Sequence, residues 1–159
     1  MKIRKVIPEE QNKVYGLFRK GFPGSTVQLN SLQKLHRNNK ILHEWVCIHT
    51  NKNIAYIAFS NAYDDSKVCG LHLLYLLVKP EFQRQGIGTE LLQFALRQQE
   101  LQDVAVYALG DRNFYERFGF ELCQNQRSKF SGKKRKLLSL GNTTASPFTV
   151  TYDPEYKPG

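Results

Sequence analysis

Hydrophobic and polar positions at the start of the chain follow the period of a strand and then the period of helices. Residues 2–7 alternate and are rich in β-forming side chains, and residues 8–10 supply the proline and acidic residues typical of a helix start. Apolar side chains at helical spacing then recur within 14–22 and again within 29–35. We therefore expect a first strand followed by two short helices.

The middle of the chain has the pattern of a hairpin followed by a buried strand. Two β-rich runs, 45–49 and 54–60, flank residues 51–53, whose Asn-Lys-Asn composition is typical of a turn. The run 71–78 shows almost no alternation with polar residues. This pattern predicts a central strand that is covered on both faces.

The second half of the chain alternates between helical and strand patterns before it becomes polar and basic. In chain order we expect a helix at 87–100, a strand at 104–109, a short helix at 113–117, and strands at 120–123 and 148–152. Segment 124–147 is predicted to be partly irregular, and the tail 154–159 to be poorly ordered. The length suits a single domain over residues 1–159, and the pattern predicts an α/β fold with a mixed sheet of six to seven strands flanked by helices.

The net charge of +9 is concentrated in one short segment. Residues 127–136 hold six Lys or Arg side chains and no acidic one. Nucleic acid, an acidic protein surface or the phosphates of a nucleotide cofactor would each satisfy such a segment, although only Phe130 could stack on a base. A solvated loop is the simpler interpretation, so the segment alone does not predict a nucleic-acid-binding protein.

The three cysteines, Cys47, Cys69 and Cys123, form no CxxC pair and lie in or beside apolar runs. This placement is typical of buried free thiols in a reducing compartment, and it predicts no metal site. The first apolar run ends at Pro8, too early for a signal peptide or a membrane span. We expect a cytoplasmic protein without membrane contact, either a monomer or a homodimer.

Two glycines follow the buried strand where the next helix begins. Unpaired amides at a helix N-terminus favour bound anions, and Gly86 and Gly88 would let phosphate oxygens approach the backbone. The spacing matches neither the P-loop nor the dinucleotide fingerprint. These residues predict an anion site, with a plain structural turn as the alternative.

Two longer motifs extend this prediction. The first is Gln83-Arg84-Gln85-Gly86-Ile87-Gly88, which matches the pattern Gln/Arg-x-x-Gly-x-Gly/Ala. The second is Leu109-Gly110-Asp111-Arg112-Asn113-Phe114-Tyr115-Glu116-Arg117-Phe118-Gly119-Phe120. With these motifs, residues 71–120 resemble the GCN5-related N-acetyltransferase (GNAT) superfamily, and the second motif is similar to a cassette of its YhbS-like bacterial members.

The resemblance implies acetyl-CoA as cosubstrate and a fold in which the central strand splays from its neighbour. In this family the pantetheine of acetyl-CoA binds in the gap like an extra strand, and the glycine loop holds the pyrophosphate. Leu76 and Val78 would offer backbone hydrogen bonds, and residues 84–89 would offer amides to the phosphates. The implied cosubstrate-binding residues are Leu76, Leu77, Val78, Gln83, Arg84, Gln85, Gly86, Ile87, Gly88, Thr89 and Tyr115.

Acyl transfer to an amine needs a neutral amine, stabilisation of the oxyanion and a proton for the departing thiolate. By resemblance, Tyr115 lies near the thioester sulfur and acts as general acid. His72 falls where some family members carry a glutamate that deprotonates the amine through water, and an ordinary histidine pKa of ~6.5 suits that task. Alternation predicts that His72 shares a face with Leu74, Leu76 and Val78, opposite Tyr75.

Other assignments of the base stay open at this point. A packed core histidine is the alternative for His72, and Glu44 is a lesser candidate base. The chain also departs from the family pattern, because Ala108 replaces an asparagine that often contacts the cofactor. Tyr75 stands where the YhbS-like members tend to have a proline.

The resemblance therefore implies an N-acetyltransferase that moves an acetyl group from acetyl-CoA to a primary amine by direct attack in a ternary complex. The acceptor is a small-molecule amine or a protein amine, and family acceptor pockets usually come from the loop here at 21–28 and from the last hairpin. The alternative is a non-catalytic acyl-CoA sensor or interaction module that uses the basic residues 127–136.

Overall fold

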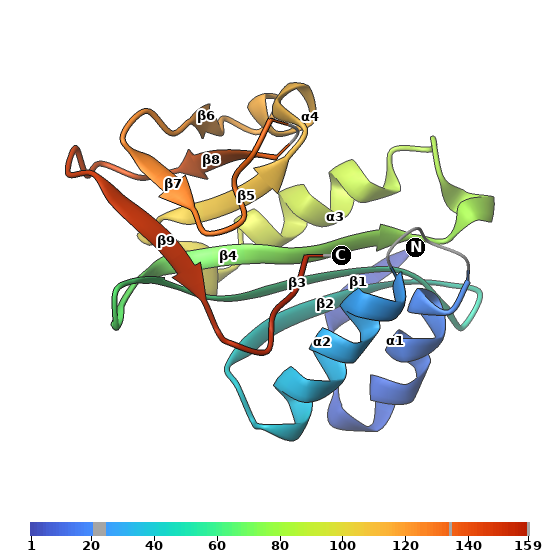
Figure 1. Cartoon of the computed structure of the whole chain (residues 1–159). Helices are drawn as coiled ribbons and strands as arrows, with labels where there is room; N and C mark the ends of the chain where they lie inside the picture. The colour runs from blue at the N-terminus through green and yellow to red at the C-terminus, as the bar shows by residue number, and fades with distance from the viewer. Residues whose placement is uncertain (21–24, 134, 159) are drawn as a thin grey trace.

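One sheet runs through the residues that the computed structural model describes, which are 1–20, 25–133 and 135–158 (Figure 1). Its nine strands within these residues are β1 (Lys2–Lys5), β2 (Leu42–His49), β3 (Lys52–Asp64), β4 (Lys67–Val78), β5 (Val106–Gly110), β6 (Glu121–Leu122), β7 (Gln126–Ser128), β8 (Lys136–Leu140) and β9 (Phe148–Tyr152). The helices of the same residues are α1 (Gln11–Phe18), α2 (Ser25–Arg37), α3 (Ile87–Leu96) and α4 (Arg112–Glu116), with short 3₁₀ turns at Pro8–Glu10, Pro80–Phe82 and Gln99–Leu101.

The sheet is mixed and is covered on both faces. Its order in the described residues is β1-β2-β3-β4-β5-β8-β6, and β9 pairs with both β3 and β7. The β4–β5 and β7–β9 pairs are parallel and the other pairs antiparallel. Helices α1 and α2 lie on one face and α3 on the other (Figure 1). The predicted mixed α/β sheet flanked by helices is confirmed.

Each face of the sheet has its own apolar core, because the helical apolar stripes meet the nonpolar faces of the strands. On one face Phe18 of α1 lies edge-to-face with Tyr75 of β4, their ring centroids 5.3 Å apart. On the other face Leu91 of α3 packs in a cluster that includes Trp45 and Phe59. Among the described residues, no helix is long and apolar enough to cross a membrane.

The basic segment 124–147 is more regular than predicted. It contains β7 and β8, and β8 pairs with β5 over five residue pairs. Leu137 and Leu138 are buried there, although basic residues precede them directly. The predicted number of six to seven strands is too small, because a charged run directly before this short apolar run obscures its strand pattern.

The C-terminal tail is packed rather than disordered, so the prediction for residues 154–159 is wrong over its described part. The Lys157 amide donates to Ser31 Oγ at 2.9 Å, and Asn38 Nδ2 donates to the Glu155 carboxylate at 2.6 Å. Tyr156 is only 5% exposed. The tail passes α2 and returns to the middle of β4 (Figure 1), where it closes the α2 face of the sheet.

Replacing the buried tail aromatic tests whether the tail belongs to the folded core. We expect Tyr156→Ala to lower the free energy of unfolding by about 3 kcal/mol, because a large buried ring is removed and leaves a cavity. Urea unfolding measures this change, with Tyr156→Phe as the matched control that keeps the ring. A loss below about 0.5 kcal/mol, the range of surface substitutions, would mean that the tail does not contribute to the core.

Candidate active site

The central feature of the site is the divergence of two parallel strands. β4 and β5 pair only at Leu71–Val106 and His72–Tyr107, although β4 continues to Val78. Beyond this contact β5 rises away from β4 (Figure 1). The side of β4 that faces β5 is therefore without a strand partner from residue 73 onward.

A close approach at Gly70 fixes where the two strands touch. A Cβ on Gly70 would lie 2.3 Å from the backbone oxygen of Ala105. Ala105 in turn accepts a hydrogen bond from the Leu71 amide at 2.8 Å. Only glycine fits at this distance, so the contact and the gap beyond it depend on the same position.

A β-bulge interrupts β4 within the gap. Leu73 and Tyr75 pair with consecutive residues of β3, so Leu74 is inserted without a partner. An inserted residue shifts the alternation of side chains between the two faces. The faces of β4 before and after residue 74 therefore do not follow a simple two-residue repeat.

The bulge corrects the predicted face of His72. The Tyr156 ring lies 5.1 Å from His72 and 6.2 Å from Tyr75, measured between centroids, so both residues lie on the α2 face. Leu76 and Val78 pack instead in the cluster under α3. The prediction that His72 shares a face with Leu76 and Val78 is wrong because strict alternation was assumed.

The backbone of β4 presents hydrogen-bonding groups to the gap. The Lys79 amide donates to the Ile54 carbonyl of β3 at 2.8 Å, so residue 79 faces β3. Backbone groups alternate in direction along an antiparallel strand, which turns Leu77 toward β3 and Leu76 and Val78 toward the gap. The resemblance predicts this orientation for Leu76 and Val78, whereas Leu77 uses its backbone within the sheet.

The glycine loop has a left-handed backbone at two positions. The φ angle is 64° at Arg84 and 81° at Gly86, the residue that precedes α3. A Cβ at Gly86 would meet no atom within 4 Å, so the backbone conformation and not space favours glycine there. No described side chain caps α3, which leaves its first amides available to an anion. Ile87 is buried and could contribute only its amide, whereas Gly88 and Thr89 are half-buried.

Two glutamine side chains hold the loop by bonding to nearby carbonyls. Gln83 Nε2 donates to the Val78 carbonyl at 3.0 Å, and Gln85 Nε2 donates to the Glu81 carbonyl at 3.4 Å. Both side chains are solvent-exposed. A ligand that donates to the Val78 carbonyl must therefore share this oxygen with the Gln83 amide or displace it.

Tyr115 is placed at the gap by the short helix α4. Asp111 caps this helix by accepting a hydrogen bond from the Asn113 amide at 3.0 Å. The Tyr115 ring packs against Phe114 and Phe120, with centroids 5.1 and 5.5 Å away. Burial, and secondarily the negative charge of Asp111, raises the pKa of Tyr115 to about 12. The phenol therefore keeps its proton at neutral pH.

A cavity of about 170 Å³ occupies the gap. Its predicted members are Leu76 and Tyr115. It is further lined by Gln28 of the loop at 21–28, Leu109 and Gly110 of the second motif, and Arg135 of the basic segment. The sequence did not point to its remaining lining residues, which are Leu73, Leu74, Tyr156 and Pro158. The tail and the basic segment thus reach the cavity from distant parts of the chain. The one sequence signal for the role of the tail was an aromatic residue, Tyr156, in a segment predicted to be poorly ordered.

His72 is fully buried beside the tail. It is 0% exposed, its ring centroid lies 4.2 Å from that of Tyr152, and neither ring nitrogen makes a well-formed hydrogen bond with a described residue. Burial lowers its pKa to about 3, an effect that the Tyr107 backbone offsets only in part. A neutral, enclosed imidazole with this pKa is a poor proton acceptor for an amine that arrives from solvent.

The other candidate base is also occupied. Glu44 Oε1 accepts a hydrogen bond from the Tyr56 hydroxyl at 2.6 Å and lies 3.0 Å from His36 Nε2. Glu44 does not line the cavity in the gap. The structure therefore does not bring Glu44, His72 and Tyr115 together as one site.

The basic segment forms a second, larger cavity of about 580 Å³. Arg127, Lys129, Arg135 and Lys136 line it, and Arg135 also lines the cavity in the gap. Phe130 stacks on Tyr152 with an interplanar angle of 8°, so it is not free to stack on a base. Lys134 and the loop residues 21–24 lie outside the described residues.

Sequence comparison places this arrangement in a family. The Acetyltransferase (GNAT) domain matches residues 41–122, which include β4, the glycine loop and Tyr115. The chain belongs to this family. A search among curated proteins gives no significant match.

Solved structures share the fold over nearly the whole chain. The GNAT family N-acetyltransferase YhbS from Escherichia coli, in complex with CoA, is 23% identical, with a TM-score of 0.85 over 97% of this chain and 90% of that one. A GNAT family acetyltransferase from Brucella melitensis, in complex with acetyl-CoA, is 20% identical, with a TM-score of 0.77 over 97% and 96%. The PaiA N-acetyltransferase from Thermoplasma acidophilum, in complex with coenzyme A, is 16% identical, with a TM-score of 0.59 over 87% and 96%. The predicted GNAT-like fold is confirmed.

The buried state of His72 predicts a specific pH dependence of stability. Its folded pKa of about 3 lies below the ordinary value of 6.5, so protons bind preferentially to the unfolded chain below pH 6.5. The contribution of His72 to stability is therefore present above pH 6.5 and is lost as the pH falls toward its folded pKa of about 3. Between pH 7.5 and 5.5 we expect His72 to account for a loss of about 1.4 kcal/mol.

Urea unfolding of the wild type and of His72→Leu at both pH values measures this contribution. The variant is expected to lack that part of the decrease, while burial of His43, which also lowers its pKa, still contributes in both proteins. An equal decrease in wild type and variant would show that folding does not lower the pKa of His72. His49→Leu, at an exposed position, serves as the control substitution.

Proposed function

We propose that this protein is an acetyl-CoA-dependent N-acetyltransferase that transfers an acetyl group to a primary amine by direct attack in a ternary complex. The observation that carries the proposal is that Tyr115 and the unpaired side of β4 line the same cavity. Family membership supports acetyl transfer in general. The three solved structures that share the fold are complexes with CoA or acetyl-CoA, which supports this cosubstrate here.

The described residues fit acetyl-CoA at both ends of the gap. Outward backbone groups of Leu76 and Val78 offer the hydrogen bonds of a missing strand, and the uncapped start of α3 offers amides for the pyrophosphate. Arg84 to Thr89 would hold the phosphates, with Gln83 sharing the Val78 carbonyl or moving off it. When bound, acetyl-CoA supplies an activated thioester.

Tyr115 is the proposed general acid. Because its pKa is raised to about 12, its hydroxyl is protonated at neutral pH and can donate to the thiolate that leaves. Nothing in the gap requires a covalent intermediate, since Cys47, Cys69 and Cys123 are not among its lining residues. The amine would attack directly and enter in its neutral form from solution.

His72 is better assigned a packing role than the predicted base role. It supports Tyr152 and Tyr156, and Tyr156 in turn forms part of the cavity wall. We therefore propose His72 as a positioning residue, which acts on the site through the tail.

Removing the Tyr115 hydroxyl tests the acid role. Tyr115→Phe keeps the ring that packs against Phe120, and we expect it to lower kcat by about 10²- to 10⁴-fold, the usual contribution of a general acid. The KM for acetyl-CoA should change little. The measurement is acetyl-CoA consumption with a panel of primary amines.

The matched control is Tyr63→Phe, which removes a hydroxyl bonded to Asp153 outside the cavity and should leave kcat unchanged. Full activity in Tyr115→Phe would rule out Tyr115 as the general acid. A wild type that binds acetyl-CoA and turns over no amine would remove the enzymatic proposal itself.

The second candidate is a non-catalytic acyl-CoA sensor that docks an anionic partner. The basic cavity supports it, because Arg127 and Lys129 are exposed at its wall. This function predicts CoA binding without turnover, together with loss of partner binding in Arg127→Glu/Lys129→Glu. Unchanged partner binding in that variant would rule out a docking role for the segment and leave its interpretation as a solvated loop.

A further inference from the structure

The cavity in the gap meets every acceptor, whatever route the acceptor takes from solvent. The amine must reach the thioester carbon, and the proposed acid Tyr115 lines this cavity. The walls around Tyr115 therefore act on each amine that reacts. These walls include residues of α2, the tail and the segment before β8, and none of them belongs to the glycine loop at 83–88. They can set the class of acceptor independently of the loop.

The cavity is small and mostly apolar. Its volume of about 170 Å³ lies below the roughly 300–1,000 Å³ of sites for drug-sized molecules. The acetyl group must share this space with the acceptor. Most of the wall is apolar, formed by the Tyr156 ring and by Leu73, Leu74, Leu76, Leu109 and Pro158. Such a wall suits an amine on a short apolar group.

The charge in this lining has one sign. Among the described residues that line the cavity, Arg135 carries a charge at neutral pH and none is acidic. The residues outside the described part of the chain, at 21–24, 134 and 159, include no Asp or Glu either. Burial raises the pKa of the Tyr156 phenol, and the charge of Arg135 opposes this rise. The positive charge therefore acts on a group inside the cavity.

The carboxylates of the neighbouring elements are directed elsewhere. Asp111 caps α4, and its charge adds to the effect of burial in raising the pKa of Tyr115. In the tail, Asp153 and Glu155 each accept a hydrogen bond from a side chain that does not line the cavity. None of these three acidic residues lines the cavity itself. An ammonium group that entered would meet no carboxylate there.

A lining of this kind selects the neutral form of an amine. An ammonium group that enters loses contact with water and meets a guanidinium group, and both effects lower the pKa of the bound amine. The first amine of an acceptor meets this requirement by entering deprotonated, which is also its nucleophilic form. A second amine on the same short molecule stays protonated at neutral pH, and Arg135 repels it.

We propose that the acceptor is a compact primary amine without a second positive charge, and that Arg135 is the specificity-determining residue that excludes dicationic amines. Rejection comes from like-charge repulsion, whereas the apolar wall binds the rest of the acceptor. This inference rests on the proposed acetyl transfer, because it names the acceptor class of that same site.

Three acceptors of equal chain length test the proposal, with acetyl-CoA consumption as the measurement at one pH. They are butylamine, aminobutanol with a terminal hydroxyl, and diaminobutane with an amine at each end. We expect kcat/KM for butylamine to exceed that for diaminobutane by about tenfold or more, and tenfold corresponds to about 1.4 kcal/mol of repulsion. Aminobutanol, which is polar at the same end but uncharged there, should lie closer to butylamine.

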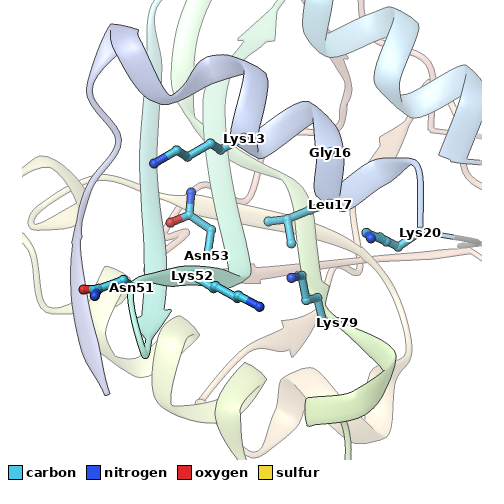
Figure 2. Close-up of a pocket in the computed structure, with 8 residues that line it drawn as sticks. All are labelled: Lys13, Gly16, Leu17, Lys20, Asn51, Lys52, Asn53 and Lys79. Atoms are coloured by element: carbon cyan, nitrogen blue, oxygen red, sulfur yellow. The ribbon is translucent and has the colours of Figure 1, made fainter.

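Variants then assign the discrimination to one side chain. Arg135→Gln should reduce the ratio of butylamine to diaminobutane to about twofold or less, because the repelling charge is removed. Arg135→Lys keeps a positive charge and should keep most of the ratio. Lys52→Gln removes an equal charge from a separate cavity beside α1, none of whose lining residues lines the gap (Figure 2). This control should leave the ratio unchanged.

Four results would overturn the proposal. Diaminobutane that reacts as well as butylamine would show that a second charge is accepted. An equal loss with aminobutanol and diaminobutane would show that polarity and not charge is rejected. An unchanged ratio in Arg135→Gln would remove the role of Arg135. Acetyl-CoA binding without turnover of any amine would remove the proposed function together with this inference, whereas the first three results leave acetyl transfer in place.

Discussion

The site depends on one contact, the short parallel pairing of β4 with β5 at Leu71 and His72. Gly70 permits the strands to meet there, because any Cβ would collide with the Ala105 carbonyl. Beyond this point the hydrogen-bonding groups of Leu76 and Val78 have no strand opposite them. Backbone groups in a sheet need partners, so the same geometry that ends the pairing creates a place for an extended ligand.

The surroundings of the gap come from parts of the chain that are far apart in sequence. Tyr115 reaches it from α4, Arg135 from the segment before β8, and Tyr156 from the tail. The tail is held against α2 by Ser31 and Asn38, and its Tyr156 ring covers His72. The proposed cosubstrate contacts and the wall of the cavity thus come from different elements, with β4 shared between them.

Local sequence patterns were sufficient to predict the mixed sheet, the hairpin, the helices and the position of the glycine loop. Each of these depends on periodicity or on a short motif within one element. The face of His72 could not be predicted, since a single inserted residue at Leu74 reverses the alternation and leaves no signal in the sequence. Leu137 and Leu138 were missed because a charged run stands directly before them.

Other features depend on contacts that no local pattern contains. The order of the tail depends on hydrogen bonds to α2 more than a hundred residues earlier. The cavity in the gap joins Tyr115, Arg135 and Tyr156, which the chain brings together only on folding. A pairing rule within one strand or helix cannot anticipate either feature.

The central claim is that the unpaired backbone of β4 receives acyl-CoA as an added strand. Residue-resolved hydrogen exchange with and without CoA tests it most directly, using the amides of Leu76 and Val78, with Leu77, which faces β3, as internal control. We expect CoA to slow exchange at Leu76 and Val78 and to leave Leu77 unchanged. CoA binding with no slowing at Leu76 or Val78 would contradict the account.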